Sequence, residues 1–401
     1  MHGYSFLDWE YVIRYLLLHN VYEVISGRQT HSQGFILRRK MYSLRVKLAL
    51  FCSLLLLTSC VFKPRDFDEA KWQETVEETK ISDLYNNNLR DETFYNPWLE
   101  QEERTFAGFL RWRFSEKPDY SEEAKKNKPE VRENLMGRIS ALPPETDFIS
   151  WIGHATFLMR IQGEYWLTDP ILTDRALLPK RVTPPAMQLK DLARLQGKLH
   201  VIISHNHYDH LDSETLENLP ENSSIYVPQG LGEYVSSITT GVVKEMNWWE
   251  ELQINTTVKL TCLPAQHWSR RIFQGYNTTL WASYMIETAE TTVYFGGDSG
   301  YFKGYREIGR LFNDIDYALL PITAYDPRWF MHYAHMDTKE AIRAFGELGA
   351  EYFIPTQWGT FHLGDNPPGL PPLDLKRDIR EMQLNPDRFL IFDIGEIRLI
   401  E

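Results

Sequence analysis

The residues with the clearest chemistry in this sequence are three histidines and one aspartate that fall within six positions. They form the segment His205-Asn206-His207-Tyr208-Asp209-His210. Imidazole nitrogens and carboxylate oxygens are ligands that zinc, iron and manganese take in proteins. Such a cluster of polar groups would be costly to assemble without a cation to share. We therefore predict that residues 205–210 form a metal-binding loop.

The elements around this loop suit a binding site. An apolar run, Val201-Ile202-Ile203, precedes it directly and is typical of a buried strand. A rigid sheet fixes the position of such a loop, while the loop exposes its side chains. The sequence predicts strands at 148–152, 156–161, 165–168, 199–204, 224–227, 258–263, 282–286, 291–295, 317–320, 352–355 and 388–392.

Helical segments fall between several of these strands. Asp337 followed by Glu340 has the spacing of a capping box and predicts a helix over 338–347. Shorter helices are predicted at 191–194 and 213–218. Many strands with surface helices between them favour one layered α/β domain.

The His-x-His-x-Asp-His pattern resembles the signature of the metallo-β-lactamase superfamily. The resemblance implies an αββα sandwich with two metal ions, most simply zinc, at one edge. It also implies two later ligands, an isolated histidine and an aspartate that follows a strand and glycines. Here these are His267, in Gln266-His267-Trp268, and Asp298, in Gly296-Gly297-Asp298. The glycines would let the backbone approach the metals without a side-chain clash.

Within that superfamily the chain resembles the branch of phospholipases D that hydrolyse N-acyl-phosphatidylethanolamine. The resemblance implies release of N-acylethanolamine and phosphatidic acid. It begins near residue 96 and extends over most of the following chain. The matching segments are Asn96-Pro97-Trp98, Trp151-Ile152-Gly153-His154-Ala155-Thr156, Leu167-Thr168-Asp169-Pro170, Asp298-Ser299-Gly300-Tyr301, residues 321–331, His335-Met336-Asp337 and Gln357-Trp358-Gly359-Thr360-Phe361.

One position departs from the pattern of this branch. Its terminal metal ligand is a histidine immediately before Trp-Gly-Thr-Phe, and here that position is Gln357. Glutamine is a weak neutral oxygen donor and replaces imidazole poorly on zinc. His362 lies nearby in the sequence, and we expect it to be an ordinary loop histidine. The second metal would therefore be weakly bound, completed by water, or a different divalent cation.

The resemblance assigns the remaining ligands and roles residue by residue. The first metal would be held by His205, His207 and His267, and the second by Asp209, His210 and bridging Asp298. The two cations would lower the pKa of a shared water, supply hydroxide for attack on phosphorus and stabilise the developing charge.

Three further residues have expected roles in this reaction. Beside catalytic Asp209, His335 is a candidate for contacting the phosphoryl group or protonating the leaving group. Its place just before the Asp337 helix start equally suits a histidine with a local structural role. We expect His154 and Asp169 to orient metal ligands rather than to bind metal themselves.

The composition argues against nucleic acid as a partner and fits a globular protein. The chain of 401 residues has 43 Lys and Arg against 55 Asp and Glu, a net charge of −12. This acidic balance argues against nucleic acid, which binds basic surfaces. Hydrophobic residues at 43% and charged residues at 24% fit a globular protein. Three cysteines are too few for a disulfide framework.

The N-terminal region has the order of a secretory signal. Arg45 and Lys47 precede an apolar run at 48–57, and Leu57-Thr58-Ser59-Cys60 resembles the end of a bacterial lipoprotein signal. The pattern predicts a lipid on Cys60 and attachment to a membrane of the bacterial cell envelope. A buried helix that happens to end in cysteine is the alternative. Residues 1–40 are interpreted as a doubtful extension that precedes the true start.

The expected organisation is therefore a doubtful extension at 1–40, a signal peptide at 41–59, a tether with helical and aromatic stretches at 60–145, and a hydrolase domain at 146–401. Residues 1–59 contain seven Lys and Arg and three Asp and Glu, so the chain from Cys60 onward has a net charge of −16. Attachment to a membrane would then depend on the lipid and on exposed aromatic residues, because anionic lipid repels an acidic protein.

Three hypotheses about function follow. The first is a metal-dependent phosphodiesterase that acts on N-acylated phospholipids. The second is a hydrolase on the same scaffold that acts on a lactone or a soluble phosphodiester. The third is a non-catalytic envelope lipoprotein whose altered site at Gln357 serves structure or binding. Metal content and release of N-acylethanolamine distinguish them.

Overall fold

The computed structural model describes residues 64–101 and 105–400. The predicted extension, signal peptide and lipidated Cys60 lie outside these residues. Arg65–Gly108 and Lys117–Glu401 form one compact unit, and Phe109–Glu116 belongs to another. The larger unit contains all of the predicted metal-centre residues, and the following description concerns that unit.

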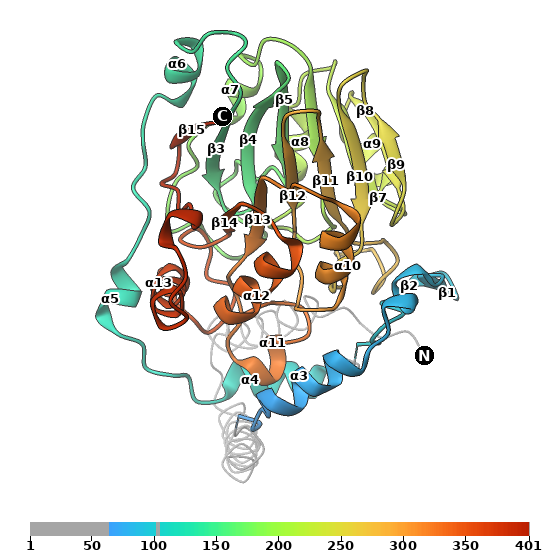
Figure 1. The fold of residues 1–401 in the computed structure, drawn as a ribbon, viewed down its shortest axis with the longest axis vertical. Helices are drawn as coiled ribbons and strands as arrows, with labels where there is room; N and C mark the ends of the chain where they lie inside the picture. The colour runs from blue at the N-terminus through green and yellow to red at the C-terminus, as the bar shows by residue number, and fades with distance from the viewer. Residues whose placement is uncertain (1–63, 102–104, 401) are drawn as a thin grey trace, which may run out of the picture. The chain divides into compact units, whose positions relative to one another are not determined.

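Two large mixed sheets form the centre of this unit (Figure 1). The seven-stranded sheet has the order β15-β3-β4-β5-β6-β7-β8, and the six-stranded sheet has the order β14-β13-β12-β11-β10-β9. Their strands are β3 Phe148–Gly153, β4 Thr156–Ile161, β5 Glu164–Thr168, β6 Leu199–Ile202, β7 Ser224–Pro228, β8 Val242–Met246, β9 Glu251–Gln253, β10 Lys259–Leu263, β11 Ser283–Glu287, β12 Thr292–Phe295, β13 Tyr317–Pro321, β14 Tyr352–Thr356 and β15 Ile397–Leu399. A small hairpin pairs β1 Leu89–Arg90 with β2 Thr93–Phe94.

Helices lie before, between and after these strands. The α-helices are α3 Glu69–Glu78, α4 Phe106–Phe114, α5 Glu122–Lys126, α6 Leu135–Ser140, α7 Leu189–Leu192, α8 Ser213–Glu217, α9 Gly232–Ser236, α10 Gly304–Leu311, α11 Arg328–Met331, α12 Thr338–Leu348 and α13 Pro371–Glu381. Two short 3₁₀ helices are η1 Ile81–Tyr85 and η2 Pro386–Arg388. The predicted capping box of α12 is present, because Asp337 and Glu340 each accept a hydrogen bond from the other's backbone N–H.

The layers follow from the alternation of side chains along the strands. In β3, Ile149 and Trp151 pack into the core between the sheets, while Phe148 and Ile152 face the opposite way. That outer face of the seven-stranded sheet is covered by α6, α7, α8 and α9. Residues of α10, α12 and α13 pack with the six-stranded sheet. Successive residues of a strand point to opposite faces. Because the residues of both sets are buried, both faces of β3 are covered. The expected αββα sandwich is confirmed.

One predicted strand is wrong. Residues 388–392 begin inside η2, which Asn385 caps by accepting a hydrogen bond from Asp387 N–H. After it, Phe389 forms a single parallel bridge with Phe353. The strand that ends the fold is β15, which lies farther along the chain and pairs antiparallel with β3. Strands β8 and β9 were also not predicted.

The segment before residue 146 contributes to the core. Asp68 caps α3, and Trp72 and Val76 on that helix are buried. Leu84, Phe94 and other apolar side chains of this segment belong to the same hydrophobic cluster as the sheets. Among the helices of residues 64–101 and 105–400, none has both the length and the apolar character needed to cross a bilayer.

Strand direction decides where the site lies. In the seven-stranded sheet, β3, β5 and β6 run in the same direction, because β4 is antiparallel to both β3 and β5. In the six-stranded sheet, β10, β12, β13 and β14 also share one direction. The segments that follow the carboxyl ends of strands with a common direction meet at one edge of their sheet. Every predicted metal ligand follows one of these strands.

Candidate metal centre

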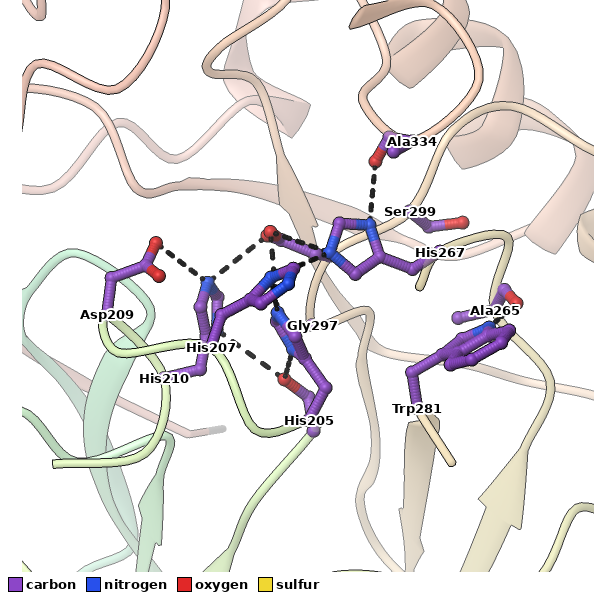
Figure 2. Close-up of polar contacts among 12 residues, drawn as sticks. His205, His207, Asp209, His210, Ala265, His267, Trp281, Gly297, Ser299 and Ala334 are labelled. Carbon is purple, nitrogen blue, oxygen red and sulfur yellow. Dashed lines mark hydrogen bonds and ion pairs between the residues drawn. The ribbon is translucent and has the colours of Figure 1, made fainter. Parts of the chain in front are cut away.

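The first cluster of ligand groups joins the loop after β6 to residues after β10 and β12. His207 Nδ1 lies 2.8 Å from His205 Nε2 and 3.2 Å from His267 Nε2. Asp298 Oδ2 lies 3.8 Å from His205 Nε2 and 3.5 Å from His267 Nε2. Figure 2 shows the three imidazole rings directed toward one another from the two sheets. Residues separated by 93 positions in the sequence therefore meet at one point.

Hydrogen bonds on the far side of two rings orient them toward this point. His267 Nδ1 lies 3.1 Å from the carbonyl oxygen of Ala334 and must donate to it (Figure 2). His205 Nδ1 lies 2.8 Å from Ser204 Oγ. Each contact leaves the Nε2 atom facing the cluster. Partners of this kind fix the tautomer and direction of metal-binding histidines.

The spacing of the first cluster fits a divalent cation. Four donors held 2.0–2.1 Å from a tetrahedral ion lie about 3.3 Å from one another. The donor separations here, from 2.8 to 3.8 Å, bracket that value. His207 Nδ1 carries at most one proton, so it can donate to only one of its two imidazole neighbours at a time. The donor set of three imidazoles and one carboxylate suits zinc and other transition metals.

The second cluster shares Asp298 with the first. His210 Nε2 lies 3.3 Å from Asp298 Oδ1 and 3.3 Å from Asp209 Oδ2. Asp209 Oδ2 also lies 3.0 Å from His154 Nε2. The two carboxylate oxygens of Asp298 thus face different clusters, which is the arrangement expected of a bridging ligand.

Asp169 fixes the second cluster from behind. It follows β5, is fully buried, and accepts hydrogen bonds from Ser204 N–H at 2.6 Å and from Ser204 Oγ at 2.5 Å. Its Oδ2 atom lies 2.6 Å from His210 Nδ1. The structure therefore places Asp169 in contact with His210, one of the predicted ligands.

The second cluster concentrates buried charge around His210. Burial alone would lower the pKa of His210, but Asp298, Asp209 and Asp169 surround it and raise this pKa well above its usual range. Burial raises the pKa of Asp298 to about 6. Burial also holds the pKa of His205 well below its ordinary value, so its Nε2 keeps a lone pair for binding. Three carboxylates thus concentrate negative charge around one imidazole.

Gln357 occupies the position of the missing histidine. It follows β14, is buried, and has the positive backbone angle φ 73°. Its Nε2 atom donates to Asp298 Oδ1 at 2.5 Å and to Gly297 O at 3.2 Å. Gln357 therefore touches the bridging carboxylate. His362 is exposed, with Nε2 3.5 Å from Asp365 O, and belongs to neither cluster.

The other predicted residue, His335, lies in the turn between α11 and α12. Its ring centroid is 5.4 Å from that of His267, and the side chain is partly exposed. It therefore stands beside the first cluster. Tyr208, between the ligands of the loop, accepts a hydrogen bond from Ile272 N–H at 3.0 Å and packs against Arg271.

Close backbone packing explains the glycine before Asp298. Gly297 has φ 56°, and a Cβ atom there would stand 2.5 Å from the Cβ of Ser204. Any side chain at Gly297 would push the Asp298 segment away from Ser204 and the metal loop. Glycine is therefore required at position 297 because the segments after β12 and β6 are in close contact. This reason adds to the close approach of the backbone to the metals that the sequence suggested.

Arg271 is a positioning residue that sequence reasoning missed. Its guanidinium is 4.0 Å from the Tyr208 ring centroid and donates to the carbonyl oxygens of Asn206 at 3.2 Å and Leu211 at 3.0 Å. It also donates to Ser213 Oγ at 3.0 Å. One buried side chain thus joins the segment after His267 to both ends of the metal loop. The position of Arg271 close after an isolated histidine was the only signal in the sequence.

Comparison with known proteins agrees with this geometry. Residues 165–358 match the model of the beta-lactamase superfamily domain. The chain is 34% identical over 269 residues to N-acyl-phosphatidylethanolamine-hydrolyzing phospholipase D 1 of Caenorhabditis elegans, which covers 62% of this chain and 75% of that protein. The chain belongs to the metallo-β-lactamase superfamily. As a member of this superfamily with two converging ligand clusters, it is a metal-dependent hydrolase.

Further relatives and solved structures also match the chain. The mitochondrial N-acyl-phosphatidylethanolamine-hydrolyzing phospholipase D of Saccharomyces cerevisiae is 32% identical over 226 residues, which cover 53% of this chain and 48% of that protein. Among solved structures, a possible metal-dependent hydrolase from Veillonella parvula has a TM-score of 0.53 at 18% identity, covering 64% of this chain and 100% of its own. Igni18, a metallo hydrolase from Ignicoccus hospitalis, has a TM-score of 0.50 at 21% identity, covering 64% and 99%. These structures support the fold alone.

Proposed function

We propose that this protein is a phospholipase D-type phosphodiesterase that hydrolyses N-acyl-phosphatidylethanolamine to N-acylethanolamine and phosphatidic acid. The observation that supports it best is the pair of ligand clusters that share Asp298, each aimed at one point. Similarity to two N-acyl-phosphatidylethanolamine-hydrolyzing phospholipases D supports the choice of substrate.

The side chains divide the task of holding the metals and the substrate. Two bound zinc ions would supply a nucleophile from water near neutral pH and neutralise charge on the phosphoryl oxygens. His205, His207 and His267 provide imidazole nitrogens at the first position. Asp298 faces both positions and keeps them close together, as attack on a phosphodiester requires.

His335 is the residue proposed to act on the leaving group. In the reaction, an oxygen from water bonds to phosphorus, and the bond between phosphorus and the ethanolamine oxygen breaks. That oxygen needs a proton as it departs. His335 stands beside His267 on the partly exposed side of the cluster, where it can contact the phosphoryl group or supply the proton.

The test is hydrolysis of a defined lipid in labelled water. The metal-loaded protein is incubated with vesicles of phosphatidylcholine that contain N-palmitoyl-phosphatidylethanolamine, in ¹⁸O-water, and the products are identified by mass spectrometry. We expect N-palmitoylethanolamine without label and phosphatidic acid with one ¹⁸O. Asp209→Asn should lose turnover because it removes a ligand of the second cluster. Asp119→Asn, at an exposed aspartate that pairs with Lys125, is the matched control.

Three results would contradict the proposal in different ways. Turnover of a lactone or a soluble phosphodiester, with none of the lipid, would assign the scaffold to another substrate. No turnover by protein with full metal content would favour a binding role. Full turnover by Asp209→Asn would remove the metal mechanism itself.

The proposal includes attachment to a bacterial envelope membrane through a lipid on Cys60. A lipid anchor would hold the enzyme beside a lipid substrate, and the acidic charge of the chain makes electrostatic adsorption unfavourable. We expect the protein made in bacteria to partition into the detergent phase of Triton X-114 and Cys60→Ser to partition into the aqueous phase. Equal partition of the two proteins would exclude this anchor.

A further inference from the structure

The amide of Gln357 cannot act as the missing ligand in the orientation that its surroundings impose. Its two partners, the carbonyl oxygen of Gly297 and Oδ1 of Asp298, are both acceptors. The amide NH₂ must therefore face them, and the amide oxygen must point elsewhere. Gln357 thus offers donors where the second metal needs a lone pair. The second site must find its fourth donor among other side chains or in water.

A buried imidazole stands next to this position. The backbone N–H of Gln357 donates to the carbonyl oxygen of His154 at 3.0 Å, so the two residues are direct neighbours between the sheets. The His154 side chain is fully buried, and its Nε2 atom lies 3.0 Å from Asp209 Oδ2. One donor atom from each of His154, Asp209 and His210 lies within 4.8 Å of the others. These three donors therefore converge at the second site.

The backbone of His154 and its other ring nitrogen provide two further observations. His154 has φ 55°, in the left-handed region that non-glycine residues seldom adopt, and such residues concentrate at functional sites. Its Nδ1 atom is buried without a hydrogen-bond partner. The contact through Nε2 is therefore the only polar contact of this ring among the described residues.

We propose that His154 is a ligand of the second metal and replaces the imidazole that is absent at position 357. Its Nε2 atom converges with donors of Asp209 and His210, and Asp298 Oδ1 lies 3.3 Å from His210 Nε2. The inference rests on the two-metal centre of the proposed function, and it changes the role expected for His154 from the sequence. The competing role is a hydrogen bond from Nε2–H that only orients Asp209.

His154→Gln separates these two roles. The amide nitrogen of glutamine can donate to Asp209 as the imidazole N–H would, but glutamine binds zinc poorly. Metal content is measured by mass spectrometry after dialysis against controlled free zinc, and affinity is measured by cobalt absorption. We expect two metals per chain in the parent and one in His154→Gln. The affinity of the second site should fall more than the 10- to 100-fold that loss of an orienting partner costs.

Restoring the usual ligand provides the decisive comparison. Adding Gln357→His to His154→Gln should return the second metal, because an imidazole again faces the site. His362→Gln, at an exposed histidine outside both clusters, should leave two metals in place. A single metal in the parent, or two metals at unchanged affinity in His154→Gln, would overturn the proposal.

A measurement on the parent protein does not depend on any variant folding. With ¹¹³Cd bound, ¹⁵N spectra of the imidazoles should show coupling between cadmium and His154 Nε2. Absence of that coupling, with coupling to His210 present, would also overturn the proposal. Metal content and these spectra need no substrate, so their failure is distinguishable from failure of the lipid hydrolysis assay.

Discussion

Replacing Asp298 with alanine should lower kcat/KM by at least about 10³-fold and remove both bound metals. A single lost electrostatic contact in an active site costs 10²- to 10³-fold, and this carboxylate serves two positions at once. Oδ2 faces His205 and His267, and Oδ1 faces His210 at 3.3 Å. Among the described residues, Asp209 contacts His210 and His154 in the second cluster and is not one of the donors of the first, so it cannot replace the Oδ2 contacts of Asp298.

The measurements are metal content and steady-state kinetics on folded protein. Circular dichroism confirms the fold, and Asp119→Ala provides an exposed aspartate as the matched control. Asp298→Asn keeps the size of the side chain but removes its charge, and should lose metal almost as completely. Retention of one tightly bound metal in either variant would show that Asp298 belongs to one site only.

Replacing Asp169 with asparagine should weaken the second metal site 10- to 100-fold while leaving the first less affected. The reason is the tautomer of His210. In the parent, His210 Nδ1 carries a proton for Asp169 Oδ2 at 2.6 Å, which leaves Nε2 free to bind. An asparagine with its NH₂ group toward His210 would favour the tautomer with the proton on Nε2. That form offers no lone pair to a cation.

Replacing Asp169 with alanine should, in addition, lower the stability of the fold. Asp169 accepts both the backbone N–H and the hydroxyl of Ser204 in a fully buried setting. Asp169→Ala leaves these donors unpaired, at about 1–3 kcal/mol for each. Thermal unfolding and separate zinc titrations of the two sites measure the two effects. Equal weakening of both sites in Asp169→Asn would show general loosening of the fold in place of a tautomer change.

Sequence reasoning predicted most of the fold because the core strands are continuous apolar runs. Continuous apolar runs of this length are typical of strands that are buried on both faces. Examples are Val201-Ile202-Ile203 and the runs at 148–152 and 317–320, which all lie in strands or at their ends. The short outer strands β8, β9 and β15 lack this signal. Aromatic and branched residues suggested a strand at 388–392. The 3₁₀ helix η2 begins at Pro386, however, and Phe389 then forms a single β-bridge with Phe353.

The ligand clusters were predictable because their residue types and spacing belong to a known pattern. Their surroundings were not. Ser204 and Arg271 orient the metal loop through contacts that depend on how two sheets meet, and neither has a distinctive spacing in the sequence. The same is true of the amide of Gln357. Its identity suggested a weak oxygen donor, but only its acceptor neighbours show that the amide presents N–H groups.

Strand direction, which brings the ligands to one edge, also has a consequence for folding. The seven-stranded sheet provides His154, Asp169 and the loop at 205–210, and the six-stranded sheet provides His267 and Asp298. Neither sheet contains a complete set of donors, and strand β15, near the end of the chain, must return to pair with β3. The centre can therefore form only after contacts distant in sequence have been made, which is the slow part of folding for such topologies. Tight metal binding therefore reports that both sheets have folded and packed against each other.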